Sequence, residues 1–396
     1  MITIVYAYEE APQSYSASIF LVGPTPRNND VESWRPLALQ TLSQYANKID
    51  LVVFIPEPRN GVYRSNYLEQ VEWEQQHLEM ADAIFAWVPR DMNTSLQGLT
   101  TNVEFGKYVE SGKLFYGRPD NAHKIKYLDW IYSNTTKRQP VNTLTALTAE
   151  IIIYLQTKLD ECDKPVREAG ERYVPLMIWS TKQFQNWYKS QHQAGNKLVN
   201  AKLLWTFIIH KINFTFSYAL HVNVWIAAED RIKSNEFIIS RPDISVVVPY
   251  WKHPTDILES EIVLVKEFRS PSRTKDSFVY ELPGGSSFKR SGILQVASDE
   301  LHEETSIKIN HNRFRYLDSK QLAATWSTHY ADVYTVELND PEIEYARQIA
   351  ASKQTFGVKK DTEVTYVEIC KLKNVGKYVD WSMEGMIYRA LMVNGK

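Results

Sequence analysis

Cysteine is nearly absent from this chain of 396 residues, which contains two, Cys162 and Cys370. Two cysteines are too few for a disulfide framework, and too few for a zinc site made of cysteine alone. The simplest interpretation is a protein kept in a reducing cytosol. We therefore expect a cytoplasmic location.

Long apolar runs are missing as well. The longest, such as 203–209, fall far short of the ~20 residues that a membrane helix needs. Residues 1–7 lack a basic segment followed by a long apolar stretch, so they predict a strand rather than a signal peptide. We expect no membrane partner.

Neither sign of charge predominates, because the formal net charge is -2. This balance gives no broad electrostatic attraction to nucleic acid, so free nucleotides fit better as partners than nucleic-acid polymers. The chain is longer than the ~250–300 residues at which a single core usually splits, and two domains are expected. We also expect a homo-oligomer.

The first half of the chain alternates short apolar runs with segments of helical spacing. The runs at 18–22, 50–56 and 82–88 predict strands, and 34–45 and 67–80 predict helices. This alternation is typical of a parallel sheet covered on both faces. We predict an α/β domain with a doubly wound sheet of the flavodoxin or Rossmann type, in which ligands bind at the carboxyl ends of the strands.

Several polar or flexible residues follow these predicted strands. Gly23 and Arg27 lie in the loop after the first, and Asp91 lies in the loop after the third. Glu104 comes next, at a predicted helix start. One interpretation of this residue is structural, because a carboxylate in the first turn stabilises the N-terminus of a helix. Its place at the sheet edge favours a role with substrate, and Gly23 and Arg27 are candidate substrate-binding residues there.

Together, these pieces resemble the nucleoside 2-deoxyribosyltransferase family and its hydrolase relatives over roughly residues 18–155. That resemblance implies Glu104 as the nucleophile that attacks the sugar, as in a retaining glycosidase. Asp91 is the candidate for contacting or protonating the departing base. The motifs that carry it are Phe20-Leu-Val-Gly-Pro24 with Trp34-Arg35, Gln70-Val-Glu-Trp73-Glu74, Ala81-Asp82 with Phe85-Ala-Trp87, and Asn102-Val-Glu104-Phe-Gly106.

A charged stretch with proline and glycine, at 161–172, follows the first domain. We place the boundary there, with a first domain at 1–162, a linker and helical connection at 163–212, and a second domain at 213–396. Strand-like segments from 214 onward predict a mixed sheet.

An acidic helix follows a glycine turn in the second domain. Glu300, Glu303 and Glu304 have the i, i+3, i+4 spacing that stacks side chains on one helical face. Carboxylates held this close repel each other unless a cation lies among them, and oxygen ligands suit Mg²⁺ or Mn²⁺. The alternative is a solvated acidic face.

The strand at 261–268, the turn and the acidic helix together resemble a Nudix hydrolase. The resemblance implies an α/β/α sandwich with a mixed sheet, metal ligands at Glu300, Glu303 and Glu304, and catalytic roles for the last two. The residues that match the family's box are Gly285, Glu300, Leu301, Glu303, Glu304 and Ile307, and those that depart from it are Ser291, Asp299 and Ser306.

Residues around the turn are similar to the ADP-ribose pyrophosphatase branch of that family. Arg269 is then a candidate for facing phosphate, since a guanidinium matches pyrophosphate oxygens, and Glu281 a candidate for contacting substrate. Asp361 or Glu363 is a candidate loop base, and the sequence does not choose between them.

The two resemblances predict a bifunctional hydrolase of nucleotide metabolism. The first domain would cleave an N-glycosidic bond. The second domain would use Mg²⁺ or Mn²⁺ to cleave a pyrophosphate. NAD or an ADP-ribose derivative would be a substrate for both domains. Two alternatives stay open: removal of modified nucleotides, and a sensor that binds an NAD-derived ligand with little turnover, which Ser291, Asp299 and Ser306 favour.

Overall fold

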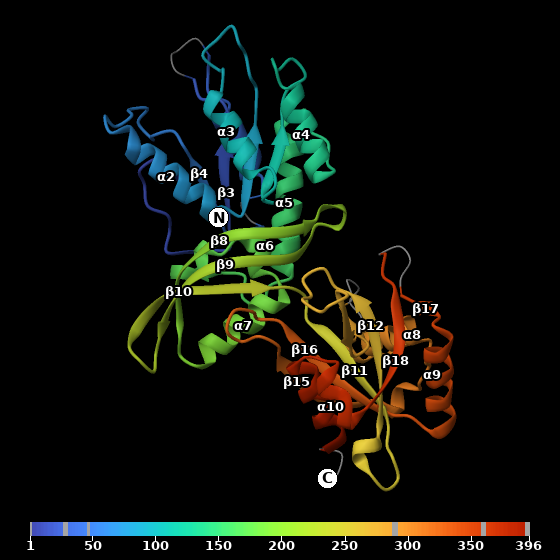
Figure 1. The fold of residues 1–396 in the computed structure, drawn as a ribbon. Coiled ribbons are helices and arrows are strands. Elements are labelled where there is room, and N and C mark those ends of the chain that lie inside the picture. Colours follow the sequence, from blue (N-terminus) through green and yellow to red (C-terminus); the bar gives the residue numbers. More distant parts are fainter. Residues whose placement is uncertain (1, 27–30, 46–47, 287–291, 358–361, 393–396) are drawn as a thin grey trace. The chain divides into compact units, whose positions relative to one another are not determined.

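The computed structural model describes residues 2–26, 31–45, 48–286, 292–357 and 362–392 (Figure 1). Its contacts divide the chain into two compact units, Met1–Arg241 and Pro242–Lys396. In the described ranges, no helix is both long and apolar enough to cross a membrane.

A five-stranded parallel sheet lies at the centre of the first unit. Its strands are ordered β1-β4-β3-β5-β6. All residues of β3, β4, β5 and β6 are buried, which explains why these strands are continuous apolar runs in the sequence. The bounds are Ile2–Tyr6 (β1), Ala17–Val22 (β3), Leu51–Ile55 (β4), Ala83–Trp87 (β5) and Leu114–Gly117 (β6).

Helices cover both faces of this sheet. Leu42 of α1 and Leu155 of α5 pack on one face, and Trp73 of α2, Phe105 of α3 and Tyr132 of α4 pack on the other. The prediction of an α/β domain with a parallel sheet is therefore confirmed. The helices are Arg35–Ser43 (α1), Tyr67–Met80 (α2), Leu99–Tyr108 (α3), Lys126–Thr136 (α4) and Leu144–Asp160 (α5).

The chain changes direction across the sheet at β3. It passes from β3 through α1 to β4 on one side, and α2 then carries it past β3 to β5 on the other side. In open α/β sheets such a switch leaves a crevice at the carboxyl ends of the strands, where ligands bind. The loops that begin at Gly23, Pro56 and Val88 all leave this edge.

The division at residue 241 differs from the predicted boundaries at 162 and 212. The charged stretch that we interpreted as a linker contains Arg167, whose side chain is fully buried and pairs with buried Asp82. Buried charges persist where they are paired and hydrogen-bonded, so this arginine belongs to the core of the first unit.

Residues 169–240 complete the first unit with two short helices and a second sheet. The sheet is antiparallel, in the order β10-β9-β8. Its inner face, with Leu198, Leu220 and Ile238, packs in the same core as Trp179 and Phe184. The elements are α6 Leu176–Trp179, α7 Lys182–Gln193, β8 Lys197–Ile209, β9 Phe214–Ile226 and β10 Arg231–Ser240, and a small ladder joins β2 Ser14–Tyr15 to β7 Arg167–Glu168.

An eight-stranded mixed sheet forms the second unit, so the prediction of a mixed sheet there is confirmed. The main path runs β15-β16-β11-β12-β18-β17; β11 and β16 pair in parallel, and β13 and β14 pair with β12 and β11. The strands are Ile244–Trp251 (β11), Glu261–Phe268 (β12), Phe278–Glu281 (β13), Gly284–Gly285 (β14), Arg315–Gln321 (β15), Tyr330–Glu337 (β16), Thr355–Phe356 (β17) and Thr365–Lys371 (β18).

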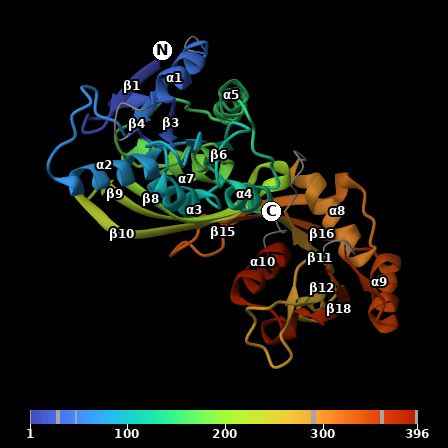
Figure 2. The ribbon, with the colours of Figure 1, turned by 90° about the horizontal axis from the view of Figure 1, so that it is seen from above.

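Helices also cover both faces of the second sheet. Ile387 of α10 (Trp381–Met392) packs in one core, and Leu301 of α8 (Ile293–Thr305) and Ile343 of α9 (Asp340–Ser352) pack in another. Figure 2 shows α10 and α9 on opposite sides of β11, β12 and β18.

Candidate active site

The loop after β3 is held in place by the two residues that start α1. Trp34 Nε1 donates to the Pro24 carbonyl at 3.0 Å, and Arg35 Nη2 donates to the Gly23 carbonyl at 2.9 Å. A Cβ at Gly23 would lie 2.1 Å from the Trp87 carbonyl oxygen, so only glycine permits this close approach to the end of β5. Gly23 thus shapes the edge, and its contact with substrate stays a prediction.

Arg35 also joins the loops after β3 and β4. Its guanidinium is almost fully buried, with Nη1 at 2.5 Å from Glu57 Oε1 and at 3.0 Å from Thr25 Oγ1. Glu57 follows β4 by two residues. A fork of donors matches several acceptors at once, so one side chain fixes three segments of the sheet edge.

Glu104 is presented by α3, whose start is tightly anchored. Gly98 caps this helix with φ +63°, and a Cβ there would lie 2.6 Å from Pro24 Cγ, so the turn requires glycine. Arg90 Nη2 donates to Asn102 Oδ1 at 2.5 Å and to the Gly98 carbonyl at 3.3 Å. The loop after β5 and the first turn of α3 are therefore held together.

Glu104 is 9% exposed. Burial, and to a smaller extent repulsion from Glu74, raises its pKa to about 7 against the opposing effect of Arg35. Glu74 is held by Gln70 Nε2, 2.6 Å from its Oε1, and the same amide donates to the Pro56 carbonyl. A carboxyl with a pKa near neutrality at the end of a parallel sheet is suited to proton transfer or nucleophilic attack.

A cavity of about 1130 Å³ opens at this edge of the first unit. Thr25 and Glu57 line it, whereas Glu104 is not among its lining residues. The link between them is Arg35, which pairs with Glu57 and acts electrostatically on Glu104. The volume is ample for a nucleoside or nucleotide. Arg27, the other predicted substrate contact here, lies outside the described residues.

Asp91 is half-exposed and contacts His123, with 3.2 Å between Oδ1 and Nδ1. The Met92 amide donates to the same Nδ1 at 3.1 Å. The Asp91 carboxylate also accepts from the Asn93 amide. Its predicted role as the acid for the departing base stays a prediction.

The second unit gathers carboxylates of its own. Glu304 on α8 is almost fully buried and accepts from the Gly284 amide at 3.0 Å. Oxygen atoms of Glu267, Glu304 and Glu363 all lie within 4.8 Å of one another, an arrangement that could hold a divalent cation. The described structure thus groups Glu304 with residues from two other segments, and Glu303 is exposed on its helix.

Burial and neighbouring carboxylates raise the pKa of Glu304 and of Glu300. For Glu304 burial is the main cause, followed by repulsion from Glu300 and Glu363. Burial, with repulsion from Glu303 and Glu363, raises the pKa of Glu300 to about 7. Glu300 lies against the glycine turn, since a Cβ at Gly285 would be 2.5 Å from its Oε1. A cation at this point would favour the ionised forms.

Arg269 is engaged with neighbouring acids. Its Nη2 lies 2.7 Å from Glu281 Oε2 and 2.7 Å from Glu267 Oε2. The two predicted substrate contacts, Arg269 and Glu281, therefore form an ion pair with each other. A phosphate would have to compete with these carboxylates for the guanidinium.

The departures from the Nudix pattern have visible consequences at two positions. Ser306 ends α8 with φ +62°, a left-handed conformation in which glycine carries no strain. Asp299 accepts from Gln295 Nε2 one turn earlier, at 2.7 Å. Ser291 and Asp361 lie outside the described residues.

Sequence reasoning gave no role to four residues that the structure places in these sites: Arg35, Glu57, Glu74 and Glu267. Glu57 had a usable signal, because it directly follows an apolar strand, as the loop at Gly23 does. Glu267 ends an apolar strand as well. Only the fold shows that Arg35 and Glu74 approach Glu104.

Residues 16–121 match the family described as nucleoside 2-deoxyribosyltransferase like. The match includes the loop at Gly23, the start of α1, Glu74 and Glu104. The first unit therefore contains a nucleoside 2-deoxyribosyltransferase-like domain. A Nudix domain is not detected, and that resemblance of the second unit stays a prediction. No curated protein matches the chain.

Proposed function

We propose that the nucleoside 2-deoxyribosyltransferase-like domain cleaves the N-glycosidic bond of a nucleoside or nucleotide, with Glu104 as its nucleophile. The observation that carries this proposal is the burial of Glu104 at the carboxyl edge of the parallel sheet, with Arg35 and Glu74 acting on its charge. Glycosyl transfer and hydrolysis share this first step and differ in what resolves the intermediate.

The reaction would proceed in two displacements. A carboxylate oxygen of Glu104 attacks the anomeric carbon as the bond to the base breaks, and the base leaves with a proton, for which Asp91 is the candidate donor. The resulting glycosyl ester is then attacked by water, or by a second base in a transferase, which frees the carboxylate. A buried carboxylate is weakly solvated, so little solvation is lost when its charge is neutralised by a covalent bond to the sugar.

The substrate class is tested by incubating the protein with NAD, ADP-ribose and a panel of nucleosides, deoxynucleosides and deoxynucleotides. Release of base without an acceptor indicates a hydrolase, and exchange that requires a second base indicates a transferase. We favour a nucleotide substrate, NAD among them. Failure of every compound to release a base would contradict the proposal.

The pH dependence of this activity should report the ionisation of Glu104. The nucleophile has to be a carboxylate, and burial raises its pKa to about 7, so kcat/KM should fall about tenfold for each pH unit below 7. Glu74→Gln removes a repelling charge and should move the midpoint to lower pH. The measurement is kcat/KM from pH 5 to 8.5, and a profile that is flat over this range would contradict the assignment.

The carboxylate group of the second unit supports a second candidate function. We propose that Glu267, Glu304 and Glu363 bind Mg²⁺ or Mn²⁺, and that the unit uses this ion on the pyrophosphate of an ADP-ribose-like ligand. The donor set fits a hard cation, since it is made of oxygen alone. The bound ion would supply charge neutralisation for phosphate oxygens, and Arg269, released from Glu281, would orient them.

Measurements of metal binding distinguish two sets of candidate ligands. One is the group Glu267, Glu304 and Glu363, and the other is the helical trio Glu300, Glu303 and Glu304. Glu304→Gln and Glu267→Gln should each weaken Mn²⁺ binding by at least about tenfold, because each removes a charged ligand. Glu303→Gln, the same change on an exposed neighbour, should have little effect. Isothermal titration calorimetry gives the Kd values, and a loss in Glu303→Gln and Glu304→Gln but not in Glu267→Gln would favour the helical trio instead.

Turnover and binding are separable in this unit. Hydrolysis of ADP-ribose that requires Mg²⁺ and is lost in Glu304→Gln would identify an enzyme. Binding of ADP-ribose without hydrolysis would identify a sensor, the alternative that Ser291, Asp299 and Ser306 favour.

A further inference from the structure

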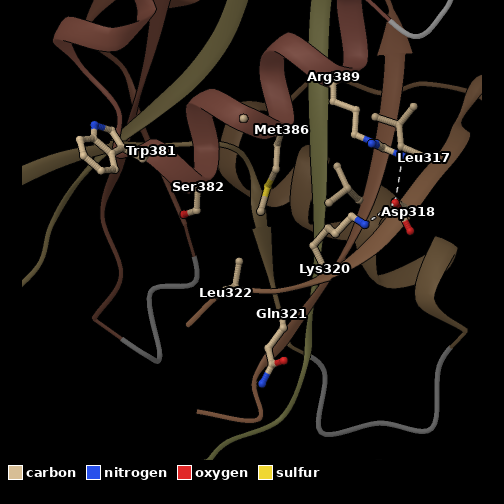
Figure 3. A pocket seen from close by; sticks show the side chains of 11 residues that line it. Leu317, Asp318, Lys320, Gln321, Leu322, Trp381, Ser382, Met386 and Arg389 are labelled. Carbon is tan, nitrogen blue, oxygen red and sulfur yellow. Dashed lines mark hydrogen bonds and ion pairs between the residues drawn. The ribbon is translucent and has the colours of Figure 1, made fainter. Parts of the chain in front are cut away.

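A second cavity lies in the second unit, between β15 and α10, with a volume of about 280 Å³ (Figure 3). It is on the face of the sheet covered by α10, whereas Glu304 belongs to α8 on the other face. None of the grouped carboxylates lines it. This cavity is therefore separate from the candidate metal site.

The floor of the cavity is apolar. Val333 and Met386 are buried there, and the half-buried side chains of Leu317 and Leu322 pack against the same core. A concave apolar surface of this kind accepts the flat or aliphatic part of a small molecule.

One end of the cavity carries excess positive charge. Asp318 Oδ2 accepts from Lys320 Nζ at 2.9 Å and from Arg389 Nη2 at 3.0 Å, so two cations share one carboxylate. Figure 3 shows both cationic side chains pointing toward Asp318. Among the lining residues, one positive charge therefore has no counter-charge, which suits an anionic group on the ligand.

Trp381 lies at the opposite end in the same view. This residue is 91% exposed, although tryptophan usually buries most of its large apolar surface. An indole beside an apolar cavity offers a flat face on which a ring can stack.

Gly385 keeps the cavity open from the side of α10. Glycine inside a helix is less favourable than alanine, yet a Cβ at this position would meet no atom of a neighbouring residue within 4 Å. Close packing therefore does not demand glycine here. Because Gly385 lines the cavity, any larger side chain would project into it.

We propose that this cavity binds a flat ring that carries a single anionic group, a phosphate or a carboxylate. The ring lies on the apolar floor beside Trp381, and the anion binds Lys320 and Arg389 in competition with Asp318. The site is independent of the proposed chemistry at Glu104 and at Glu304.

The test uses the full chain and isothermal titration calorimetry. Adenosine 5′-monophosphate and indole-3-acetate are the two probes, one for a phosphate and one for a carboxylate, and adenosine and inorganic phosphate supply the ring alone and the anion alone. Gly385→Leu fills the cavity, and Arg389→Met removes a cation while keeping the length of the side chain. Circular dichroism checks that each variant is folded.

We expect at least one probe to bind with a Kd of about 1 mM or lower, and both variants to weaken that binding by at least about tenfold. The ring alone and the anion alone should bind more weakly than the probe that joins them. The proposal is overturned if neither probe binds, or if binding persists unchanged in folded Gly385→Leu, which would place the ligand elsewhere on the chain.

Discussion

Replacing Glu104 by glutamine should lower the rate of N-glycosidic cleavage by about a thousandfold or more. The amide has nearly the shape of the carboxyl but cannot attack the anomeric carbon or carry the negative charge that stabilises an oxocarbenium-like transition state. The loss should appear in kcat and in kcat/KM, because the missing interaction belongs to the chemical step. Steady-state kinetics with the best substrate of the panel measures it.

The same variant should be no less stable than the original protein. The pKa of Glu104 is raised from 4.5 in the unfolded chain to about 7 in the fold, so the fold loses stability as the pH rises from about 4.5 to about 7, and the full loss is present above that pH. Glutamine removes this cost. At pH 8 the free energy of unfolding of Glu104→Gln should therefore rise, by up to about 3 kcal/mol.

Glu110→Gln is the matched control, because Glu110 is an exposed glutamate shortly after the same helix. It should change neither the rate nor the stability by a measurable amount. If Glu104→Gln retained more than about a tenth of the activity, the nucleophile would have to be sought elsewhere.

Replacing Arg167 by methionine should destabilise the first unit by about 3–5 kcal/mol. Arg167 Nη1 lies 2.9 Å from Asp82 Oδ1, and both side chains are fully buried. Methionine fills much of the space but leaves the Asp82 charge without its partner. Urea unfolding, followed by a probe specific to the first unit, gives the free energy.

The double change Asp82→Asn with Arg167→Met should recover part of this loss, since the uncompensated charge is then gone. Lys189→Met is the control, because Lys189 and Asp163 form an exposed ion pair, and its loss should cost less than about 1 kcal/mol. A loss from Arg167→Met no larger than that of Lys189→Met would mean that the charged stretch at 161–172 does act as a linker.

Much of the first unit could be predicted from its sequence. The strands and helices follow from apolar runs and helical spacing, because a parallel sheet covered on both faces needs apolar residues throughout. Glu104 and the loop at Gly23 were also within reach, since both follow predicted strands at an edge where ligands bind.

Contacts between distant segments were not within reach. The segment with Arg167 has the composition of a solvated linker, and only its ion pair with Asp82, 85 residues away, shows that it is part of a core. The group of carboxylates around Glu304 was not within reach for the same reason. Spacing on one helix cannot show that Glu267 and Glu363, from other segments, come close to Glu304.

The most direct test of the central claim is a search for the covalent intermediate on Glu104. The protein would be incubated with a 2-fluoro-substituted nucleoside or nucleotide, which slows breakdown of a glycosyl ester, and its peptides analysed by mass spectrometry. We predict an added mass equal to the fluorosugar on the peptide that contains Glu104, and none in Glu104→Gln. Release of base with no adduct at Glu104, or with an adduct on another residue, would contradict the account.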